Sequence, residues 1–507
     1  IDIDIRERSL YIHVNVINMI YKSMSRSYDM SRRSQKAAQT RENIIAATER
    51  LLASRLLDEI TLQAIAKEAG TTVQTVLRHM DSRDGCFESV AREVAARVKQ
   101  QRGISEYVSI DDAIETPRQP MFYSAWLLAL AGLAGILVSA DAFNIFVFME
   151  ISSLASYILV AGGPDRRALP AVFKYLIMGT IGATFYLIGV GLVYMMTGTL
   201  NLADMELRIH EVADQRPILV AAGFITVGLA LKAALFPLHV WLPNAYTFAP
   251  HAVTVFLAAC ATKVSLYVLM RFDFVVFQQN LAGHEAQFAA FLMPLAVLAI
   301  LVGSAVALFE NNLKRLLAYS SVAQIGYILL GASMVSVAGL SAGVLHMFNH
   351  ALAKGALFLA VMCLATRFAE LDLKRLAGAA RAMPWTMAAL VLGGLSLIGV
   401  PGTAGFISKW YLVTAALDEG ALGIFLIAVV VIGSLMAVVY IWRIIEAAWF
   451  ATPADNSSAD VVPGEAPTVM LLVTWGIALA NIAFGLWTGT QRELAERAAG
   501  TLLGSLP

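Results

Sequence analysis

The sequence predicts an all-α, polytopic membrane protein with a small soluble helical domain near its N-terminus, and three observations lead to this fold class. Of the 507 residues, 58% are hydrophobic and only 15% are charged, whereas about a quarter of the residues of a soluble globular protein are charged. From Met121 onward, apolar stretches follow one another almost without interruption, and each approaches the ~20 residues that cross a bilayer. Residues 31–103 hold no long apolar run, and their thirteen Lys or Arg exceed nine Asp or Glu.

The first 34 residues are predicted to be a disordered extension. They begin without Met and lack the pattern of a signal peptide, which has a basic start, an apolar core and a small-residue cleavage site. We expect translation to start within this segment, at Met19, Met24 or Met30. Residues 35–103 are assigned to the soluble domain and residues 104–120 to a linker. The excess of positive charge favours contact with nucleic acid, but it equally fits the solvated face of any small helical domain.

Eleven spans are predicted in the membrane domain, residues 121–490, and residues 491–507 are assigned to a tail. The loops on one side carry ten Lys or Arg and those on the other side five. Because basic loops stay in the cytoplasm, we expect a bacterial cytoplasmic (inner) membrane with the N-terminal segment inside and the C-terminus outside. The spans lie near 121–139, 142–162, 171–197, 217–242, 251–271, 288–309, 315–334, 338–366, 384–412, 420–450 and 466–488.

Two predicted spans are interrupted, and they occupy matching places in the order. The fourth is broken at Pro237 and the ninth at Pro401-Gly402. If spans one to five and six to ten are repeats, their odd number makes the repeats inverted, with a broken fourth helix in each. Transporters place ion sites at such breaks, because unpaired backbone groups are tolerated at midplane only beside protein or water. Simple proline kinks are the alternative.

Six ionisable side chains lie deep within the apolar spans. A charge at the centre of a membrane helix costs ~3 kcal/mol, so the five that are not histidine cost roughly 15 kcal/mol unless they are paired or hydrated. Packing alone does not explain why such charges are kept in the membrane. A relay of titratable groups along a hydrated path would explain it. The six are Glu150, Lys232, Lys263, His350, Lys354 and Lys409, and the weaker candidates are His346, His239 and Lys174.

Each candidate has a simpler explanation that stays open. A Glu150–Lys232 pair sets the proton affinity of its neighbours in the relay, or it is a static ion pair between helices. Lys263 lies about twelve residues into its span, which is too deep for easy snorkelling to an interface. Lys409 lies closer to an interface. Lys174 and His239 are as well explained as loop or interfacial residues.

A stripe of basic residues is predicted on one helix, because His346, His350 and Lys354 recur at a spacing of four. Histidine titrates near physiological pH and suits proton exchange, although His346 alone also fits a hydrogen-bonded structural role. No third ligand accompanies the two histidines, and the three cysteines are far apart, so we predict no metal site, no disulfide and no cofactor.

The sequence segments around these residues resemble those of the antiporter-like subunits shared by NADH–quinone oxidoreductases and multisubunit monovalent cation/proton antiporters. The resemblance covers about residues 121–490, and within the family the sequence is most similar to the D-type antiporter subunit. It implies two inverted five-helix repeats and a proton path over Glu150 with Lys232, Lys263, His350 with Lys354, and Lys409. The matching strings are FNIFVFMEISSLASY, LKAALFPLHVWLPNAYTFAP, ATKVSLYVLMRF, LKRLLAYSSVAQIGYILLG, HMFNHALAKGALFL and PGTAGFISKWYL.

This resemblance implies a proton- or cation/proton-translocating subunit that works with other membrane subunits in a lipid bilayer, moving protons with or without Na+ or K+. The alternative is an N- or M-type proton-pumping subunit of NADH–quinone oxidoreductase or a membrane hydrogenase. No redox chemistry is expected in this chain, so partner subunits hold the electron carriers in that case. An inactive scaffold subunit is a further alternative.

Residues 40–90 resemble the DNA-binding domain of TetR-type repressors, with LQAIAKEAG as the supporting helix and TTVQTVLRHM as the recognition helix. Such a helix enters the major groove, and the sequence also allows a membrane-tethered transcription regulator. Leu77 and Met80 stand where that family prefers aromatic residues. The implied DNA contacts are Thr72, Gln74, Thr75, Arg78 and His79.

Overall fold

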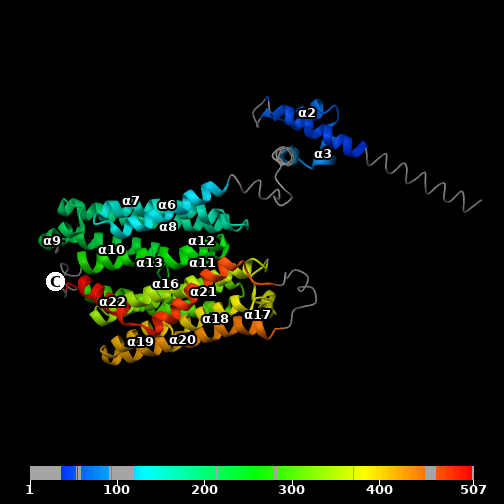
Figure 1. The fold of residues 1–507 in the computed structure, drawn as a ribbon. Helices are drawn as coiled ribbons and strands as arrows, with labels where there is room; N and C mark the ends of the chain where they lie inside the picture. Colours follow the sequence, from blue (N-terminus) through cyan, green and yellow to red (C-terminus); the bar gives the residue numbers. More distant parts are fainter. Residues whose placement is uncertain are drawn as a thin grey trace, which may run out of the picture. The chain divides into compact units, whose positions relative to one another are not determined.

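The computed structural model describes residues 36–52, 54, 59–90, 93, 118–212, 215–277, 284–368, 370–451 and 464–504 (Figure 1). The chain divides into two compact units, residues 1–120 and 121–507, and each is treated by itself below. The predicted extension and most of the predicted linker lie outside the described residues, so both stay predictions.

The described part of the N-terminal unit is helical. Threonine side chains cap its two short central helices, because Thr61 and Thr72 each accept a hydrogen bond from the backbone amide three residues on. These two helices pack together over a small apolar core that includes Ile65 and Val76. The helices are residues 36–52, α2 (Leu62–Glu68), α3 (Val73–Met80) and residues 83–90.

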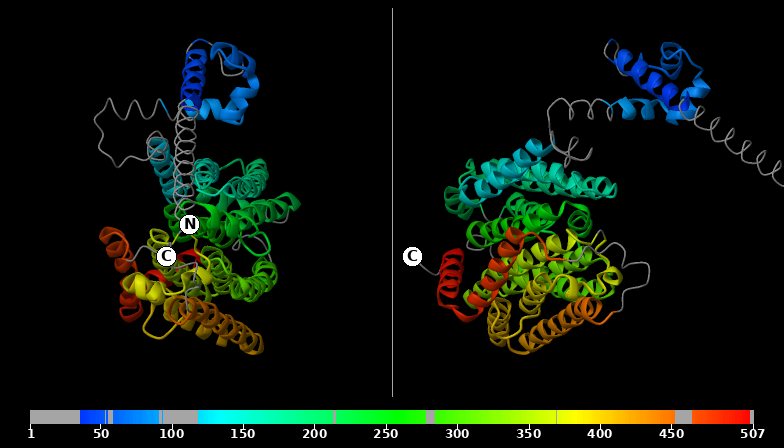
Figure 2. Two further views of the ribbon diagram at one scale, coloured as in Figure 1. Left: turned by 90° about the vertical axis from the view of Figure 1, so that its right-hand side faces the viewer. Right: turned by 45° about the vertical axis from the view of Figure 1, so that its right-hand side comes forward.

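The regular elements described in the membrane unit are all helices, and the long ones lie side by side with roughly aligned axes (Figures 1 and 2). They are α6 (Arg118–Val138), α7 (Ala142–Ala161), α8 (Ala168–Thr197), α9 (Leu202–Val212), α10 (Arg216–Lys232), α11 (Leu242–Phe248), α12 (His251–Phe256), η2 (Leu257–Ala261), α13 (Thr262–Met270), η3 (Arg271–Phe277), α14 (His284–Phe309), α15 (Leu313–Ser333), α16 (Val337–Ala365), η4 (Leu373–Leu376), α17 (Ala379–Ala382), α18 (Pro384–Ile398), α19 (Ala404–Leu417), α20 (Gly420–Trp449), α21 (Thr468–Leu486) and α22 (Gly489–Leu502).

Nine helical stretches in the described residues are long and apolar enough to cross a membrane. They correspond to nine of the eleven predicted spans. The predicted span 217–242 is occupied by α10, which ends at Lys232, and by the non-helical stretch before α11. The predicted span 384–412 holds α18 and the first part of α19. The polytopic all-α class is therefore confirmed, and the number eleven stays a prediction. Most of the predicted tail is the helix α22.

Both predicted breaks fall where the helices stop. α10 ends at Lys232, and Pro237 lies in the turn before α11. α18 ends at Ile398, and the turn before α19 holds Gly399 and Gly402 with φ of 91° and 88°. These left-handed conformations favour glycine, since a side chain there clashes with its own backbone. A proline that bends a continuous helix does not describe either place.

The core of the membrane unit sits around α15 and α16. In α15, 94% of the membrane-crossing window is buried, against 33% in α6 and α20 and 22% in α21. Helices at the rim present large apolar side chains such as Leu127, Ile424 and Leu472 outward, as expected where lipid replaces water. Ionisable groups on α15 and α16 are consequently held inside protein and away from lipid.

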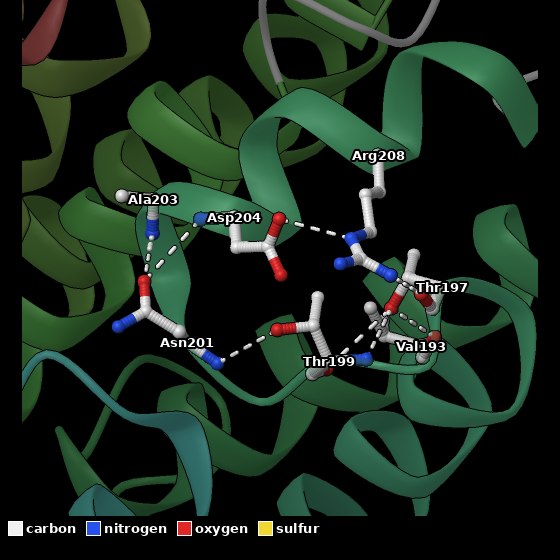
Figure 3. Close-up of polar contacts among 7 residues, drawn as sticks. All are labelled: Val193, Thr197, Thr199, Asn201, Ala203, Asp204 and Arg208. Carbon is white, nitrogen blue, oxygen red and sulfur yellow. Dashed lines mark hydrogen bonds and ion pairs between the residues drawn. The ribbon is translucent and has the colours of Figure 1, made fainter.

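Two turns fix the ends of the bundle in a similar way. Asp141 caps α7 and forms an isolated bridge with Asn201, while Asn312 caps α15 and forms an isolated bridge with Asp372. Figure 3 shows the first turn, in which the Asn201 side chain accepts hydrogen bonds from the backbone amides of Ala203 and Asp204 in the first turn of α9. The starts of α7 and α15 are therefore each fixed by a cap and by a backbone bridge to a distant turn.

Arg208 on α9 connects this helix to the end of α8. Arg208 Nε lies 2.9 Å from Asp204 Oδ1, and its Nη1 donates to the carbonyl of Thr197 over 3.2 Å (Figure 3). The hydrogen bond from Arg208 is the main reason that the pKa of the Asp204 carboxyl lies below its usual range. This short amphipathic helix is thus tied to the bundle by polar contacts at its first turn.

Candidate functional site

Five of the six main candidates are buried in the membrane unit. The exposed fractions are 8% for Lys232, 7% for Lys263, 2% for His350, 0% for Lys354 and 5% for Lys409. These values exclude snorkelling for the four lysines, because a snorkelling lysine keeps its ammonium in water. Glu150 is half-buried, with 25% of its side chain exposed.

The first group is an ion pair between α7 and the end of α10. Lys232 Nζ lies 3.0 Å from Glu150 Oε1 and 2.8 Å from Ser153 Oγ. α10 stops at Lys232 because the chain turns into the break, so the lysine stands at the C-terminal end of a helix, where a cation is favoured. The structure brings the expected pair into contact, while its role in a relay stays a prediction.

Lys263 lies beside an irregular stretch of its own helix. Residues Leu257–Ala261 form a wide π-type turn, and the Lys263 ammonium donates to the Ala258 carbonyl within it. Such turns leave carbonyls available that a regular helix would use, and they often occur at functional sites. A cavity of about 360 Å³ borders the lysine and is lined by Leu130, Tyr267 and Met347 among others.

His350 and Lys354 lie on α16, one turn apart and fully inside the bundle. Lys354 Nζ donates to the Leu317 carbonyl of α15 over 2.7 Å and also contacts Ser320 Oγ. Neither ring nitrogen of His350 has a hydrogen-bond partner among the described residues. Buried polar groups are usually paired, so this imidazole is unusual in leaving both ring nitrogens available, and its role in a relay stays a prediction.

His346 is held from both sides. Its Nδ1 lies 2.8 Å from Ser408 Oγ and its Nε2 lies 2.9 Å from Gln324 Oε1. Its ring is roughly parallel to that of His350, with centroids 6.3 Å apart. Two fixed hydrogen bonds match the structural alternative, and they also connect α16 to α15 and α19.

Lys409 on α19 donates hydrogen bonds to the C-terminal end of α18, where the second break begins. Its ammonium donates to the carbonyls of Leu397 and Ile398, each over 3.0 Å, and to Ser434 Oγ over 3.1 Å. The last carbonyls of a helix have no partner within it, so the break in α18 creates the acceptors that hold this lysine. The ammonium also lies 4.6 Å from the ring centre of Tyr327, a favourable cation–π distance.

The helices that carry these groups follow one another through the bundle. α7 and α10 both pack against α8, α10 packs against α13, and α16 packs against η2 and α19. The views in Figures 1 and 2 agree with this order. The helices that carry the candidates therefore form one series from α7 to α19, with α16 between α13 and α19.

The remaining two weaker candidates lie on α8 and in the first break. Lys174 is exposed on α8. His239 lies in the break between α10 and α11, where its ring stacks on Phe236 with centroids 5.2 Å apart. Among the described residues, no group of three or more His, Cys, Asp or Glu side chains could hold a metal ion.

Sequence reasoning missed two buried ionisable residues. Lys314 counts as a loop residue in the sequence, yet it is only 4% exposed and donates to the Ala249 carbonyl over 2.7 Å. Asp273 is 1% exposed and accepts a hydrogen bond from Thr226 over 3.1 Å. The apolar residues that follow Asp273 were the available signal, because they continue the helix to Phe277.

The predicted DNA-contacting residues lie on or beside α3. Gln74, Arg78 and Thr72 are exposed, while Thr75 and His79 are half-buried. The hydroxyls of Thr72 and Thr75 lie 2.9 Å apart at the start of the helix. The opposite face packs inward through Val76 and Met80, so the outward face carries the polar groups that the resemblance implied.

Two family comparisons match the two units. Residues 139–437 match the family described as NADH:quinone oxidoreductase/Mrp antiporter, TM. Residues 44–90 match the family of bacterial regulatory proteins of the tetR type.

Individual relatives agree with the first match. The N-type subunit of NADH-quinone oxidoreductase from Desulforudis audaxviator is 43% identical over 382 residues, which are 73% of this chain and 75% of the relative. The D-type subunit of the Na(+)/H(+) antiporter from Alkalihalophilus pseudofirmus is 31% identical over 58% of this chain and 59% of the relative. A chain in the Mrp complex from Dietzia sp. DQ12-45-1b superimposes with a TM-score of 0.69 at 28% identity, covering 75% of this chain and 77% of that one.

Proposed function

Because this chain belongs to the NADH:quinone oxidoreductase/Mrp antiporter family of membrane subunits, we propose that it moves protons across the membrane along its buried ionisable residues. One observation carries the proposal. Lys263, Lys354 and Lys409 are buried, and their hydrogen bonds in the described structure go to carbonyls and hydroxyls and not to carboxylates. An uncompensated charge costs ~3 kcal/mol at each position, and that cost disappears whenever the amine passes its proton on.

In the proposed mechanism, a proton enters from the cytoplasm and reaches Lys263 past the broken fourth span. Separation of Lys232 from Glu150 leaves the Lys232 charge uncompensated and raises the positive potential beside Lys263. The proton then moves by way of His350 and Lys354 to Lys409 and leaves outside. Only protons are transferred, and no covalent bond of the chain changes.

The proposal includes two inverted five-helix repeats, and matched contacts support them. The bridge between Asp141 and Asn201 recurs 171 residues on, between Asn312 and Asp372. Likewise, an arginine near the end of the fifth span in each half donates to the carbonyl just before the second span: Arg271 to Ser139, and Arg443 to Glu310. The same spacing separates Ser139 from Glu310, so two independent contacts repeat together.

The host complex has two candidates. A multisubunit cation/proton antiporter is the first, with Na+ or K+ exchanged for protons, and the antiporter relatives support it. A proton-pumping NADH–quinone oxidoreductase is the second, favoured by the 43% identity to an N-type subunit. In vesicles that contain the whole native complex, proton movement on addition of Na+ or K+ indicates the first, and proton movement on addition of NADH indicates the second.

The proposed placement is a bacterial cytoplasmic membrane with the N-terminal unit inside. A separate role in DNA binding is proposed for that unit on the basis of the tetR match and the exposed Gln74 and Arg78. Comparing DNA retention by the full chain and by a Gln74→Ala/Arg78→Ala variant, at several salt concentrations, tests this role. Equal retention would argue that α3 does not read DNA.

Transport is tested with Lys263→Ala in vesicles that contain the native complex, using a dye whose fluorescence reports the proton gradient. We expect at least a tenfold loss of the initial rate. Lys374→Ala is the matched control, because Lys374 is an exposed lysine of the same unit. Unchanged transport in the Lys263 variant, at equal protein content, would refute the relay and favour a scaffold subunit.

A further inference from the structure

Lys314 occupies an unfavourable place for a cation. It is the second residue of α15, and the N-terminal end of a helix repels positive charge. It is also 4% exposed. Its ammonium donates to a neutral carbonyl, that of Ala249, and none of the ion pairs found among the described residues includes it.

This lysine borders a polar cavity of about 290 Å³ at the end of the bundle where α12 and α15 begin. The cavity is formed by four separate parts of the chain: the α7–α8 loop, the α11–α12 junction, the start of α15 and the loop after α16. Its other ionisable lining residues are Asp165, Arg167, His251, Arg315, Glu370 and Asp372.

The two arginines of the cavity wall have acidic partners. Arg167 lies 2.6 Å from Asp165, Arg315 lies 3.0 Å from Glu310, and Glu370 lies 2.9 Å from Arg375. Asp372 accepts a hydrogen bond from Asn312 over 3.4 Å. His251 Nδ1 has no partner among the described residues. Lys314 and His251 are therefore the two basic groups of the cavity wall that are not neutralised.

One helical stretch connects the wall of this cavity to Lys263. His251 begins α12, and Lys263 follows twelve residues later, which is about 18 Å of helix at 1.5 Å per residue. The stretch between them holds the buried hydroxyls of Thr254 and Thr262, 0% and 1% exposed. The Tyr246 hydroxyl reaches the same stretch, because it donates to the Leu257 carbonyl over 3.1 Å. Polar groups thus continue from the cavity toward the relay.

Lys314 is also specific to one half of the unit. With the 171-residue spacing of the two bridges, its matched position is Phe143, an exposed apolar residue. The duplicated scaffold consequently does not require a lysine here. A buried charge that the fold does not need calls for another reason.

We propose that Lys314 is a further proton-carrying residue, which exchanges protons between this polar cavity and Lys263. This inference rests on the proposed proton transport. His251 and Lys314 take up protons from the cavity, and the hydroxyls along the helix that starts at His251 connect them to Lys263. The amine keeps its hydrogen bond to Ala249 in both protonation states, since a neutral amine still donates.

The test compares three variants in vesicles that contain the native complex: Lys314→Arg, Lys314→Met and Lys314→His. Arginine keeps the charge and the hydrogen bond but cannot release its proton. We expect at least a tenfold loss of the proton transport rate for both Arg and Met. Histidine titrates near pH 6.5, so we expect the His variant to transport within about threefold of the parent at pH 6 and more than tenfold more slowly at pH 8.

Lys374→Met is the matched control, with protein content and melting temperature measured for every variant. An Arg variant that transports like the parent would show that Lys314 is only a structural clamp and would overturn the inference. So would a His variant that equals the Met variant at every pH. Either result, together with a loss of transport in Lys263→Ala, leaves the proposed function standing.

Discussion

The pair between Glu150 and Lys232 separates a working relay from a static contact. Three variants are compared: Glu150→Gln, Lys232→Met and the double variant. In a static pair, transport is lost only because the helices come apart, so the double variant recovers both stability and transport. In a relay, the double variant recovers stability and still fails to transport.

The structure sets the size of the expected stability changes. Glu150→Gln leaves the Lys232 charge, whose side chain is 6% exposed, without its counter-ion. Breaking a buried pair costs 3–5 kcal/mol, and we expect about 3 kcal/mol, because Ser153 still accepts a hydrogen bond from the ammonium. Lys232→Met leaves a carboxylate that is 25% exposed and partly screened, so about 1–2 kcal/mol is expected. The double variant should lie within about 1 kcal/mol of the parent.

Two measurements decide between these accounts. The free energy of unfolding is measured in mixed detergent micelles, and the transport rate is measured by dye quenching in vesicles at equal protein content. Because the single costs add to about 4–5 kcal/mol and the double variant lies near the parent, we expect a favourable coupling of about 4–5 kcal/mol in stability. We also expect at least a tenfold loss of transport in all three variants. Recovery of transport in the double variant would falsify the relay role of this pair.

Other predictions address the second break and the contact between Arg208 and Asp204 on α9. Lys409→Met removes three hydrogen bonds, but it also removes a buried charge, so we expect unfolding free energy within about 2 kcal/mol of the parent and loss of transport; normal vesicle transport would contradict this. Gly399→Ala and Gly402→Ala both force a left-handed alanine at about 1–2 kcal/mol, yet only the Cβ at 399 meets Lys409, at 3.0 Å from Cδ. We therefore expect transport to fall in the first variant alone, and equal transport rates would oppose a role for this contact. Arg208 lowers the pKa of the Asp204 carboxyl in the folded protein. The pair therefore stabilises the fold at pH values above the pKa that Asp204 has in the unfolded chain, and this stabilisation is lost as the pH falls through the lowered pKa of the folded state. Arg208→Ala should accordingly lower the melting temperature slightly at pH 7 and not at pH 2, and a difference that persists at pH 2 would point to its bond with the Thr197 carbonyl instead.

The sequence predicted those features that depend on strong local signals. Proline and glycine within apolar runs located both breaks, and the buried charges from Glu150 to Lys409 stood out against hydrocarbon. Lys314 was missed because it lies two residues from Asn312, where a loop and a helix start look alike in sequence. Its burial depends on α11 and the α7–α8 loop, which are distant in the chain. The partners Ser434 and Ser153 were likewise invisible, since a serine in an apolar span is common and only packing reveals its neighbour.

The acceptors chosen for the buried lysines follow one physical logic. Lys263, Lys354 and Lys409 each donate to a backbone carbonyl, and two of these carbonyls belong to an irregular turn or a helix end. A carboxylate partner would favour the charged amine strongly and so trap the proton. A carbonyl accepts a hydrogen bond from an ammonium and from a neutral amine, so both protonation states remain accessible. The irregular turn in η2 and the end of α18 therefore supply partners that orient Lys263 and Lys409 without fixing their charge. In the proposed transport, the carboxylate partner of Lys232 is expected to favour its charged state, unlike the carbonyl partners of the other three lysines.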